Sequence, residues 1–421
     1  MQFFSRKYIF SYLYKLLCKK QIAASYSLSW EQRKVGDLLI ERNQQAPMSD
    51  EYPLMAFIAN EGVAPKGERY DRSALVTDTV NKLYKKTEKG DFIYSSNNLE
   101  TGSIGLNKYG KACISPVYSI FEPTGIADSD FLGRRLVRKD FINAMVKWRQ
   151  GVIYGQWRIH ESDFLKIEIT VPSVEEQRKI GAYLDQLDNL ITLHQRKYDK
   201  LTNVKKSMLE KMFPKNGSNV PEIRFKGFTE AWEQRKFSDV VATRRGLTYK
   251  PSDIRKNGVR VLRSSNIAED SFVLSDEDVF VVREAVNIDC VRANDILITA
   301  ANGSSRLVGK HTIISGIPEE SAVHGGFMLL GTTKEPHFVN ASMGSSWYRR
   351  FIELFVAGGN GAIGNLNKND LDNQDIAIPS EKEQKKIGSF FRQLDNLITL
   401  HQRELEKLKN IKKSCLENMF V

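Results

Sequence analysis

The sequence has few cysteines, and their spacing fits neither a disulfide framework nor a metal site. The four lie far apart and form no CxxC or Cys/His pattern: Cys18, Cys113, Cys290 and Cys415. This spacing argues against structural zinc and predicts a reduced, cytoplasmic protein without bound metal. No segment reaches about eighteen consecutive apolar residues, so no membrane-spanning helix is expected.

Motifs that carry catalysis are also lacking. The sequence contains no HExxH, GxSxG, P-loop or methyltransferase-like NPPY pattern, and its six histidines show no recognisable catalytic spacing. The segment Gly359–Gly364 matches GxGxxG, but a helix-like stretch precedes it instead of an apolar strand. We therefore expect a glycine-rich turn and predict no catalytic residue. The rival reading, a nucleotide-dependent enzyme, requires NAD or S-adenosylmethionine binding by this chain alone.

Charge is unevenly distributed along the chain. Of the net charge of +11, residues 1–34 carry +6, residues 173–213 carry +2 and residues 380–421 carry +3. The remainder is neutral, so net charge by itself is a weak argument for a nucleic-acid partner.

What the sequence does contain is a duplication. The stretch QLDNLITLHQR occurs at Gln186–Arg196 and again, unchanged, at Gln393–Arg403, a shift of 207 positions. A second block, WEQRK, opens each half at Trp30–Lys34 and Trp232–Lys236. Between the blocks the halves diverge, apart from the weak echo of Gly90–Asn98 in Asn294–Asn302. A constant frame with diverged inserts indicates two related modules that recognise different things.

Each copy of the repeated stretch belongs to a predicted long helix. Ser173 and Ser380 are candidate N-caps, and each is followed three residues later by glutamate, which is typical of a capping box. Apolar residues then recur with the 4-3 spacing of a coiled-coil seam, which both copies interrupt with histidine at the same place. The seam positions are Ile180, Leu184, Leu187, Ile191, His194 and Leu201, and Ile387, Phe391, Leu394, Ile398, His401 and Leu408.

The linker between the repeats favours an antiparallel helix pair. Residues 214–231 join the end of the first helix to the second WEQRK block. In a parallel pair this linker would have to span roughly 60 Å almost fully stretched, at about 3.3 Å per residue. In an antiparallel pair the end of the first helix lies near the start of the second, so the linker has only a short distance to span.

These patterns predict an α+β protein with two related modules in tandem pseudo-repeat, separated by two long antiparallel coiled-coil helices. The predicted parts are an atypical N-terminal extension (1–29), a first domain (30–172), a central spacer helix (173–213), a linker (214–231), a second domain (232–379) and a C-terminal spacer helix (380–421).

The twin WEQRK blocks, the twin helices and the dissimilar inserts resemble the specificity subunits of type I restriction–modification systems. The resemblance extends over nearly the whole chain from Trp30. It implies that the two modules are α/β target recognition domains of a non-catalytic subunit, and that each domain reads one half of a bipartite target in double-stranded DNA. It also implies that the helices set the spacer and dock two methyltransferase subunits, and that two restriction subunits complete the complex. S-adenosylmethionine, ATP and Mg would be used by those partners, and none would be bound by this chain.

One departure from the pattern lies at the N-terminus. Residues Val220–Phe228 precede the second WEQRK block with the lead-in VPEIRFKGF, and the first block has no such lead-in. We therefore expect residues 1–29 to be an atypical start of the first module.

Polar side chains in the diverged segments are the candidates for DNA contacts, because Arg, Lys, Asn, Gln and Ser bind base edges and phosphates. In the first module they are Asn97, Asn98, Lys108, Arg134, Arg135, Tyr154, Gln156, Trp157 and Arg158. In the second they are Arg244, Arg245, Arg263, Ser265, Asn266, Asn302, Ser304, Ser305, Arg306, Lys310, Asn365, Asn367 and Lys368. Loop Asn and Ser residues are also common turn formers, and Arg134–Lys139 also fits a solvated helix face.

The outer face of the repeated stretch is the candidate docking surface for the partners. Asp188, Asn189 and Gln195 and their counterparts would present the same surface twice, once to each of two identical subunits. A coiled-coil adaptor without any DNA role is the alternative, and it leaves the two diverged inserts unexplained. DNA binding and its salt dependence distinguish the two.

Overall fold

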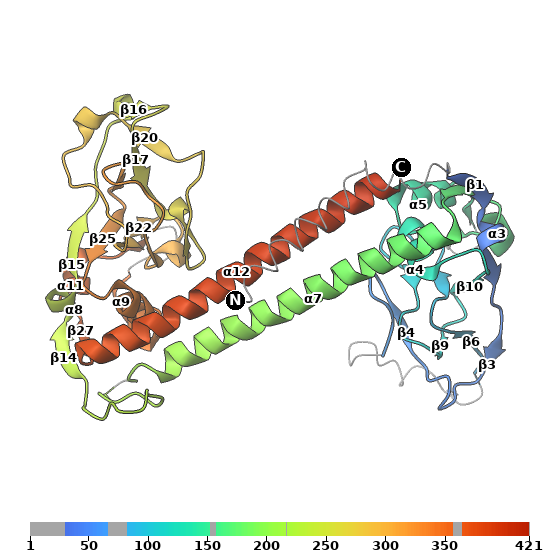
Figure 1. The fold of residues 1–421 in the computed structure, drawn as a ribbon, viewed down its shortest axis with the longest axis horizontal. Helices are drawn as coiled ribbons and strands as arrows, with labels where there is room; N and C mark the ends of the chain where they lie inside the picture. The colour runs from blue at the N-terminus through green and yellow to red at the C-terminus, as the bar shows by residue number, and fades with distance from the viewer. Residues whose placement is uncertain (1–29, 66–81, 152–156, 216, 357–363, 421) are drawn as a thin grey trace. The chain divides into compact units, whose positions relative to one another are not determined.

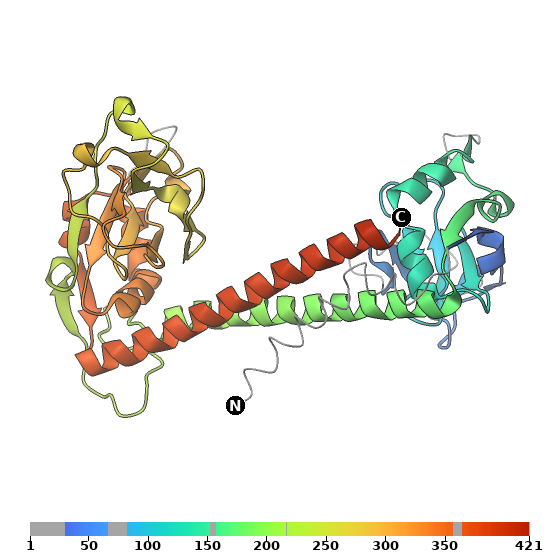
Figure 2. The same cartoon turned by 45° about the horizontal axis from the view of Figure 1, so that its top comes forward.

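The computed structural model of the chain describes residues 30–65, 82–151, 157–215, 217–356 and 364–420. The fold is α+β, with two modules in tandem and two long helices, as predicted (Figure 1). The chain divides into two compact units, of which one comprises Met1–Ile191 with Leu408–Val421 and the other Thr192–Lys407. Each unit therefore holds one module and a part of both long helices (Figure 2).

The first module is built from short strands and short helices. Its elements are β1 (Glu31–Lys34), α3 (Val35–Leu38), β2 (Leu39–Glu41), β3 (Gln45–Ala46), β4 (Ala56–Ile58), β5 (Gly62–Ala64), β6 (Tyr84–Thr87), β7 (Phe92–Tyr94), β8 (Ile104–Leu106), β9 (Ala112–Ile114), β10 (Ser119–Pro123), α4 (Ser129–Arg135), α5 (Lys139–Val146), β11 (Gln150–Gly151), β12 (Trp157–Arg158), α6 (Glu161–Phe164) and β13 (Glu168–Val171). The helix α7 (Val174–Lys211) follows.

The second module repeats this order with variations. Its elements are β14 (Glu233–Lys236), α8 (Phe237–Val240), β15 (Ala242–Arg245), η3 (Pro251–Asp253), β16 (Ile254–Arg255), β17 (Val259–Leu262), η4 (Ser264–Asn266), β18 (Ile267–Ala268), β19 (Ser271–Phe272), β20 (Val279–Val281), η5 (Arg283–Ala285), β21 (Ile296–Thr299), β22 (Ala301–Asn302), η6 (Ser305–Leu307), β23 (His311–Ile313), β24 (Ala322–His324), β25 (Met328–Thr332), α9 (Pro336–Met343), α10 (Ser346–Phe355), β26 (Gly364–Asn365), α11 (Lys368–Asp372) and β27 (Asp375–Ile378). The helix α12 (Glu381–Met419) follows.

The same four-stranded antiparallel sheet lies at the centre of both modules. Its order is β2-β10-β7-β8 in the first and β15-β25-β21-β23 in the second. The strands β7 and β21 are buried along their whole length, which fits their mainly apolar sequences. The flanking sheets differ, since β3-β6-β9 in the first module contrasts with β16-β20-β17-β24 in the second.

The WEQRK block closes each module. In the first module β1 pairs with the last strand, β13, and places Glu31 opposite Val171. In the second, β14 pairs with β27 and places Glu233 opposite Ile378 in the same register. Because each closing strand leads directly into a long helix, this pairing fixes the start of α7 and α12 on its own module.

Both helices show the predicted 4-3 pattern of burial. Leu184 and Leu187 in α7, and Phe391 and Leu408 in α12, are buried, whereas the residues between the seam positions are mostly exposed. Within the first unit the early part of α7 packs with the late part of α12, and Asp188 lies 2.5 Å from Lys412. The second unit repeats this ion pair, because Lys205 lies 2.9 Å from Asp395. The helices are therefore antiparallel in each unit.

The seam histidines contact each other in the second unit. The Nδ1 atoms of His194 and His401 lie 3.1 Å apart. Burial, followed by repulsion from His194 and Lys197, lowers the pKa of His401, while Glu404 opposes the shift. The folded state therefore binds fewer protons than the unfolded state near pH 6, and His401 makes stability fall as the pH drops through its unfolded pKa of about 6.5.

Replacing His401 by leucine should remove that pH dependence. We expect urea unfolding of His401→Leu to vary less between about pH 7.5 and 5.5 than that of the wild type, because the titrating group is gone. His160→Leu serves as the control, since His160 lies in the first module at the N-cap of α6 and outside the seam. An unchanged pH dependence in His401→Leu would contradict the assignment.

Three aromatic side chains join each module to the end of a long helix. In the first unit, Trp30, Phe131 and Phe420 pack with ring centroids 5.3 to 6.5 Å apart. In the second, Trp232, Phe338 and Phe213 occupy the corresponding positions at 5.8 to 6.0 Å. Phe420 ends the helix of the second repeat, and Phe213 ends that of the first. Each module is thus completed by the helix of the other repeat.

The lead-in that only the second WEQRK block possesses packs on the start of α12. Arg224 donates two hydrogen bonds to the Glu383 carboxylate, both 2.7 Å long. Phe225 packs edge-on against Phe390, and Lys386 lies over the Phe225 ring. The corresponding N-terminal extension, 1–29, lies outside the described residues.

None of the helices in the described ranges is long and apolar enough to cross a membrane. Within the same ranges, His, Cys, Asp and Glu side chains form no group of three or more that could hold a metal ion.

Candidate nucleic-acid interface

In the second module, candidate residues from distant segments meet beyond the end of β21. The chain continues from β21 into β22, which pairs with β26, so that Asn302 lies opposite Gly364 and Ala301 opposite Asn365. The Leu366 amide also donates to the Ala300 carbonyl at 2.7 Å. This two-stranded ribbon places Asn302 and Asn365 together although they are 63 positions apart, and Asn365 is exposed.

The Asn302 side chain organises the surrounding loops. Its amide group donates to the Ser264 hydroxyl at 2.9 Å, and its oxygen accepts the Ser304 backbone N–H at 2.9 Å. Consequently η4 and the turn that precedes η6 are held against the same ribbon. Arg263, Ser265 and the stretch Ser304–Arg306 remain exposed around it.

The candidate arginines of this module fall into two groups. The Arg244 guanidinium donates to the backbone oxygens of Asp289 and Cys290, both at 3.0 Å, and so it holds a loop in place. Arg245, Arg263 and Arg306 are exposed or at the surface and form no ion pair with any residue in the described part of the chain. These three side chains have free donors for an anionic or polar ligand.

Three predicted contacts of the second module have internal roles. The prediction for Asn266 is wrong, because its side chain is 1% exposed and its amide bonds Val273 and Asp278. Asn367 caps α11, and Lys368 pairs with Asp372 on the same helix. Lys310 is half-buried and accepts the Thr299 N–H at 2.8 Å only through its backbone carbonyl, so its side chain stays a candidate. The exposed Ser305 lies at the start of η6.

The first module has a related edge of polar loops beyond its central sheet, and different residues form it. After β7, the side-chain oxygen of the exposed Asn97 accepts the Trp157 backbone N–H at 2.6 Å, and Ser96 accepts that of Ile159 at 3.0 Å. Asn98 is exposed beside it. The β11–β12 ribbon presents Trp157, which is 49% exposed, and Arg158. Tyr154 and Gln156 lie outside the described residues.

Arg158 lies 3.8 Å from Glu161, and the other basic candidates of the first module also contact acidic side chains. Arg134 is only 12% exposed and pairs with Asp185 and, at 2.8 Å, with Asp188 on α7. Arg135 pairs with Asp140 at 2.8 Å. The prediction that these arginines bind DNA is therefore corrected, because their charges stabilise the attachment of α4 and its neighbours. Lys108 is more exposed, yet it also lies 3.1 Å from Asp185.

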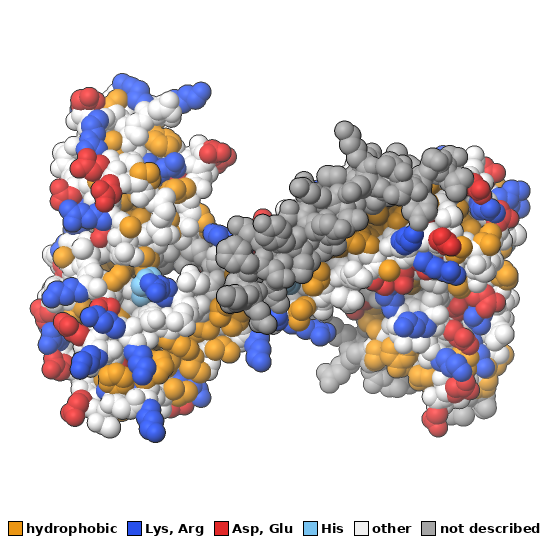
Figure 3. All heavy atoms as spheres, in the orientation of Figure 1, with side chains coloured by type: hydrophobic (Ala, Val, Ile, Leu, Met, Phe, Trp, Pro, Cys, Tyr) orange, Lys and Arg blue, Asp and Glu red, His pale blue; other side chains and the backbone are white. Residues whose placement is uncertain are grey.

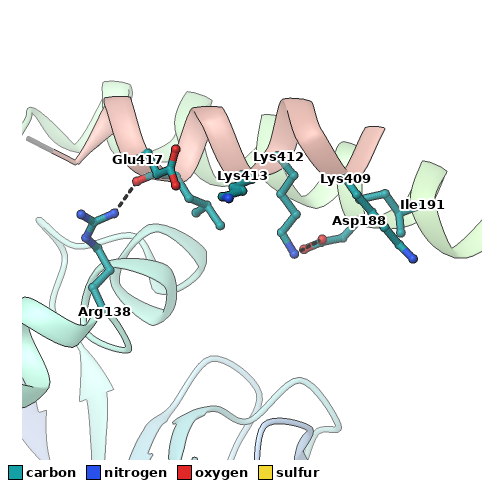
Figure 4. A pocket seen from close by; sticks show the side chains of 8 residues that line it. Arg138, Asp188, Ile191, Lys409, Lys412, Lys413 and Glu417 are labelled. Atoms are coloured by element: carbon teal, nitrogen blue, oxygen red, sulfur yellow. Dashed lines mark hydrogen bonds and ion pairs between the residues drawn. The ribbon is translucent and has the colours of Figure 1, made fainter. Parts of the chain in front are cut away.

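Asp188 was predicted on a free docking face, and that prediction is also wrong. Burial alone would raise the pKa of Asp188, but Lys412 and Arg134 outweigh it and hold the pKa below its ordinary value. Figure 4 shows Lys412 pointing toward Asp188 in an open groove of the first unit that Lys409 and Lys413 also line. Of the predicted face, Asn189 is exposed, and the Gln195 amide donates a hydrogen bond to Asp199.

The two edges correspond position by position. Asn98 and Asn302 follow the matching strands β7 and β21, and Arg158 and Asn365 lie at equivalent positions of the strands β12 and β26, whose pairing partners differ. Figure 3 shows acidic and basic side chains interspersed over the visible face of both modules, in line with the neutral charge of the inserts. Particular polar side chains, and not a surface charge of one sign, therefore distinguish the two edges.

Comparisons with known proteins agree with this duplicated organisation. The sequence model of the family described as type I restriction modification DNA specificity domain matches residues 27–203 and 229–410. The type I restriction enzyme MjaVIII specificity subunit of Methanocaldococcus jannaschii is 23% identical over 413 residues, which cover 92% of this chain and 91% of the relative. The putative MjaX specificity subunit of the same organism is 24% identical over 280 residues, which cover 62% and 60%.

Among solved structures, the S subunit of a type I restriction–modification system from M. genitalium has the same fold. It matches with a TM-score of 0.53 at 14% identity, and the match covers 94% of this chain and 96% of that one. The family model spans both modules and most of both long helices. The chain therefore belongs to the family of type I restriction–modification DNA specificity subunits.

Proposed function

We propose that this chain is the non-catalytic specificity subunit of a type I restriction–modification enzyme, in which each module reads one half of a bipartite DNA target. The observation that carries the proposal is the pair of corresponding edges. Both follow the same central sheet, but one presents Asn97, Trp157 and Arg158, and the other presents Arg263, Arg306 and Asn365. A shared scaffold with different side chains suits two different half-sites, since base edges are distinguished by the pattern of donors and acceptors.

The helices would set the spacer and dock the partners. The repeated stretch offers the same exposed residues twice, including Asn189 in α7 and Asn396 in α12, and this repetition supports two identical methyltransferase subunits. Those subunits would bind S-adenosylmethionine, and two restriction subunits would use ATP and Mg. We propose that this chain binds none of these cofactors and acts in the cytoplasm, where its DNA target is.

Arg306→Ala should change recognition of one half-site and leave the other unchanged. The Arg306 side chain is exposed and has no ion-pair partner in the described ranges, so a base or phosphate contact would be lost without damage to the fold. A lost bidentate contact to a base costs about 1–3 kcal/mol, roughly 5- to 150-fold in affinity. Mapping methylated adenines in cells that express the variant with its methyltransferase subunits would measure this.

Arg283→Ala is the matched control, because Arg283 is an exposed arginine of the same module that lies 3.6 Å from Glu320. It should leave the methylated sequence unchanged. Methylation of the original target at full stoichiometry by Arg306→Ala would contradict the assigned contact. A purified complex without sequence preference, or binding without the steep salt dependence of phosphate contacts, would instead support the adaptor alternative.

A further inference from the structure

Each module exposes one large apolar side chain at the turn that leads into its central sheet. Phe327 precedes β25 and is 71% exposed, and Val117 lies two residues before β10 and is 69% exposed. Neither side chain is explained by the packing of its own module. Sequence reasoning missed both, because a single apolar residue in a turn has no distinguishing pattern.

The two residues occupy the same structural position. The second turn is closed by a hydrogen bond from the Met328 amide to the Gly325 carbonyl at 2.8 Å, and the first by one from Tyr118 to Ser115 at 3.3 Å. The second turn precedes β25, which lies between β15 and β21 in the central sheet. The first turn precedes β10, which lies between β2 and β7. The exposed residue is the third residue of the turn in both modules. An apolar group at this place is thus a shared feature of two otherwise diverged modules.

The backbone at Phe327 is held firmly while its ring stays in solvent. The Phe327 carbonyl accepts the backbone N–H groups of Ala300 and Ala301 at 2.9 and 3.0 Å, and the Gly325 amide donates to Leu262 at 2.8 Å. The neighbouring Gly246 packs so closely that a Cβ atom there would lie 2.0 Å from the Gly325 oxygen. An aromatic ring on a fixed backbone binds a ligand with little loss of conformational entropy.

The same hydrogen bonds place Phe327 among the polar side chains of the candidate interface. Ala301 is followed by Asn302, and Leu262 is followed by the exposed Arg263. The surface therefore combines hydrogen-bonding groups with one apolar contact. The major-groove edge of an A·T pair has this combination, because adenine offers N6 and N7 and thymine offers its C5-methyl group.

We propose that Phe327, and Val117 in the first module, each contact the C5-methyl group of a thymine in the half-site that their module reads. This inference rests on the proposed function. Valine and phenylalanine share apolar character but not an aromatic ring, so methyl contact fits both residues, whereas base stacking fits only one. The thymine contacts would add specificity that hydrogen bonds alone do not supply.

Replacing single thymines of the mapped target by deoxyuridine tests the contact, since this removes only the methyl group. We expect the wild-type complex to lose about fourfold in affinity at one thymine of the second module's half-site, the loss that corresponds to burial of one carbon group. Phe327→Ala should bind the normal target more weakly and be insensitive to deoxyuridine at that thymine. Val117→Ala should behave in the same way at the other half-site only.

Leu354→Ala is the matched control, because Leu354 is 72% exposed and belongs to the helix α10 and not to the turn. It should retain the wild-type response to every deoxyuridine. A Phe327→Ala complex that still loses fourfold at the same thymine would overturn the proposal. Loss of the methyltransferase subunit from the Phe327→Ala complex during purification would also overturn the proposal, because Phe327 would then contact a protein. A wild-type complex without sequence preference would instead refute the proposed function itself.

Discussion

Replacing Glu383 by alanine should destabilise the second unit by about 3–5 kcal/mol, the usual cost of removing one partner from a buried ion pair. The Glu383 side chain is 1% exposed, and its carboxylate accepts both hydrogen bonds from the Arg224 guanidinium, which is itself 12% exposed. Without the carboxylate, that guanidinium would remain largely buried and unpaired. The change should appear as a lower urea midpoint for unfolding of the second unit, with the lead-in 220–228 exchanging its amide hydrogens faster.

The first repeat supplies the control for Glu383. Glu176 is the same residue at the same position of α7, but it is half-exposed and forms no ion pair within the described residues. Glu176→Ala should therefore cost only the interaction of a carboxylate with the helix N-terminus, about 0.3–1 kcal/mol. Replacing Arg224 by methionine and Glu383 by leucine together should restore most of the lost stability, because no charge is then left buried. Equal losses for Glu383→Ala and Glu176→Ala would contradict the proposed role of the ion pair.

The long helices could be predicted from the sequence because the spacing of apolar residues that specifies them lies within each helix. The 4-3 spacing from Ile180 to Leu201 specifies a buried stripe, and the length of the linker decides the direction of pairing. The side-chain partners could not be predicted in this way. Whether Asp188 points to solvent or to Lys412 depends on the rotation of each helix about its axis, which the spacing of apolar residues fixes only roughly.

The candidate interface was predictable only in part for a similar reason. Asn302 and Asn365 were both candidates, yet their contact through the β22–β26 ribbon depends on the pairing of segments far apart in the chain. Asn266 and Arg134 have the residue types of DNA readers, and only the structure shows that their polar groups are already bonded within the protein. Composition identifies groups that can bind DNA, whereas burial and internal partners decide which of them are free.

Phe420→Ala should loosen the first module and leave the second intact. Phe420 is 4% exposed, and its ring packs against Phe131 at 5.3 Å and Trp30 at 6.5 Å between centroids. Truncation of a buried phenylalanine costs about 3–5 kcal/mol through lost burial and the cavity left behind. Hydrogen exchange should therefore accelerate in α4, which carries Phe131, and not in α9, which carries Phe338.

The duplication makes this prediction reciprocal. Phe213→Ala removes the equivalent ring from the cluster of Trp232 and Phe338, so exchange should accelerate in α9 and not in α4. Leu397→Ala controls for a general effect on the helices, because Leu397 is 44% exposed and its loss should cost less than about 0.5 kcal/mol. Equal acceleration in both modules for either phenylalanine would contradict the separate anchoring of the two modules. The opposite responses of Phe420→Ala and Phe213→Ala would instead establish that each recognition module depends on the helix of the other repeat, so that neither half of the duplicated chain is complete without the other.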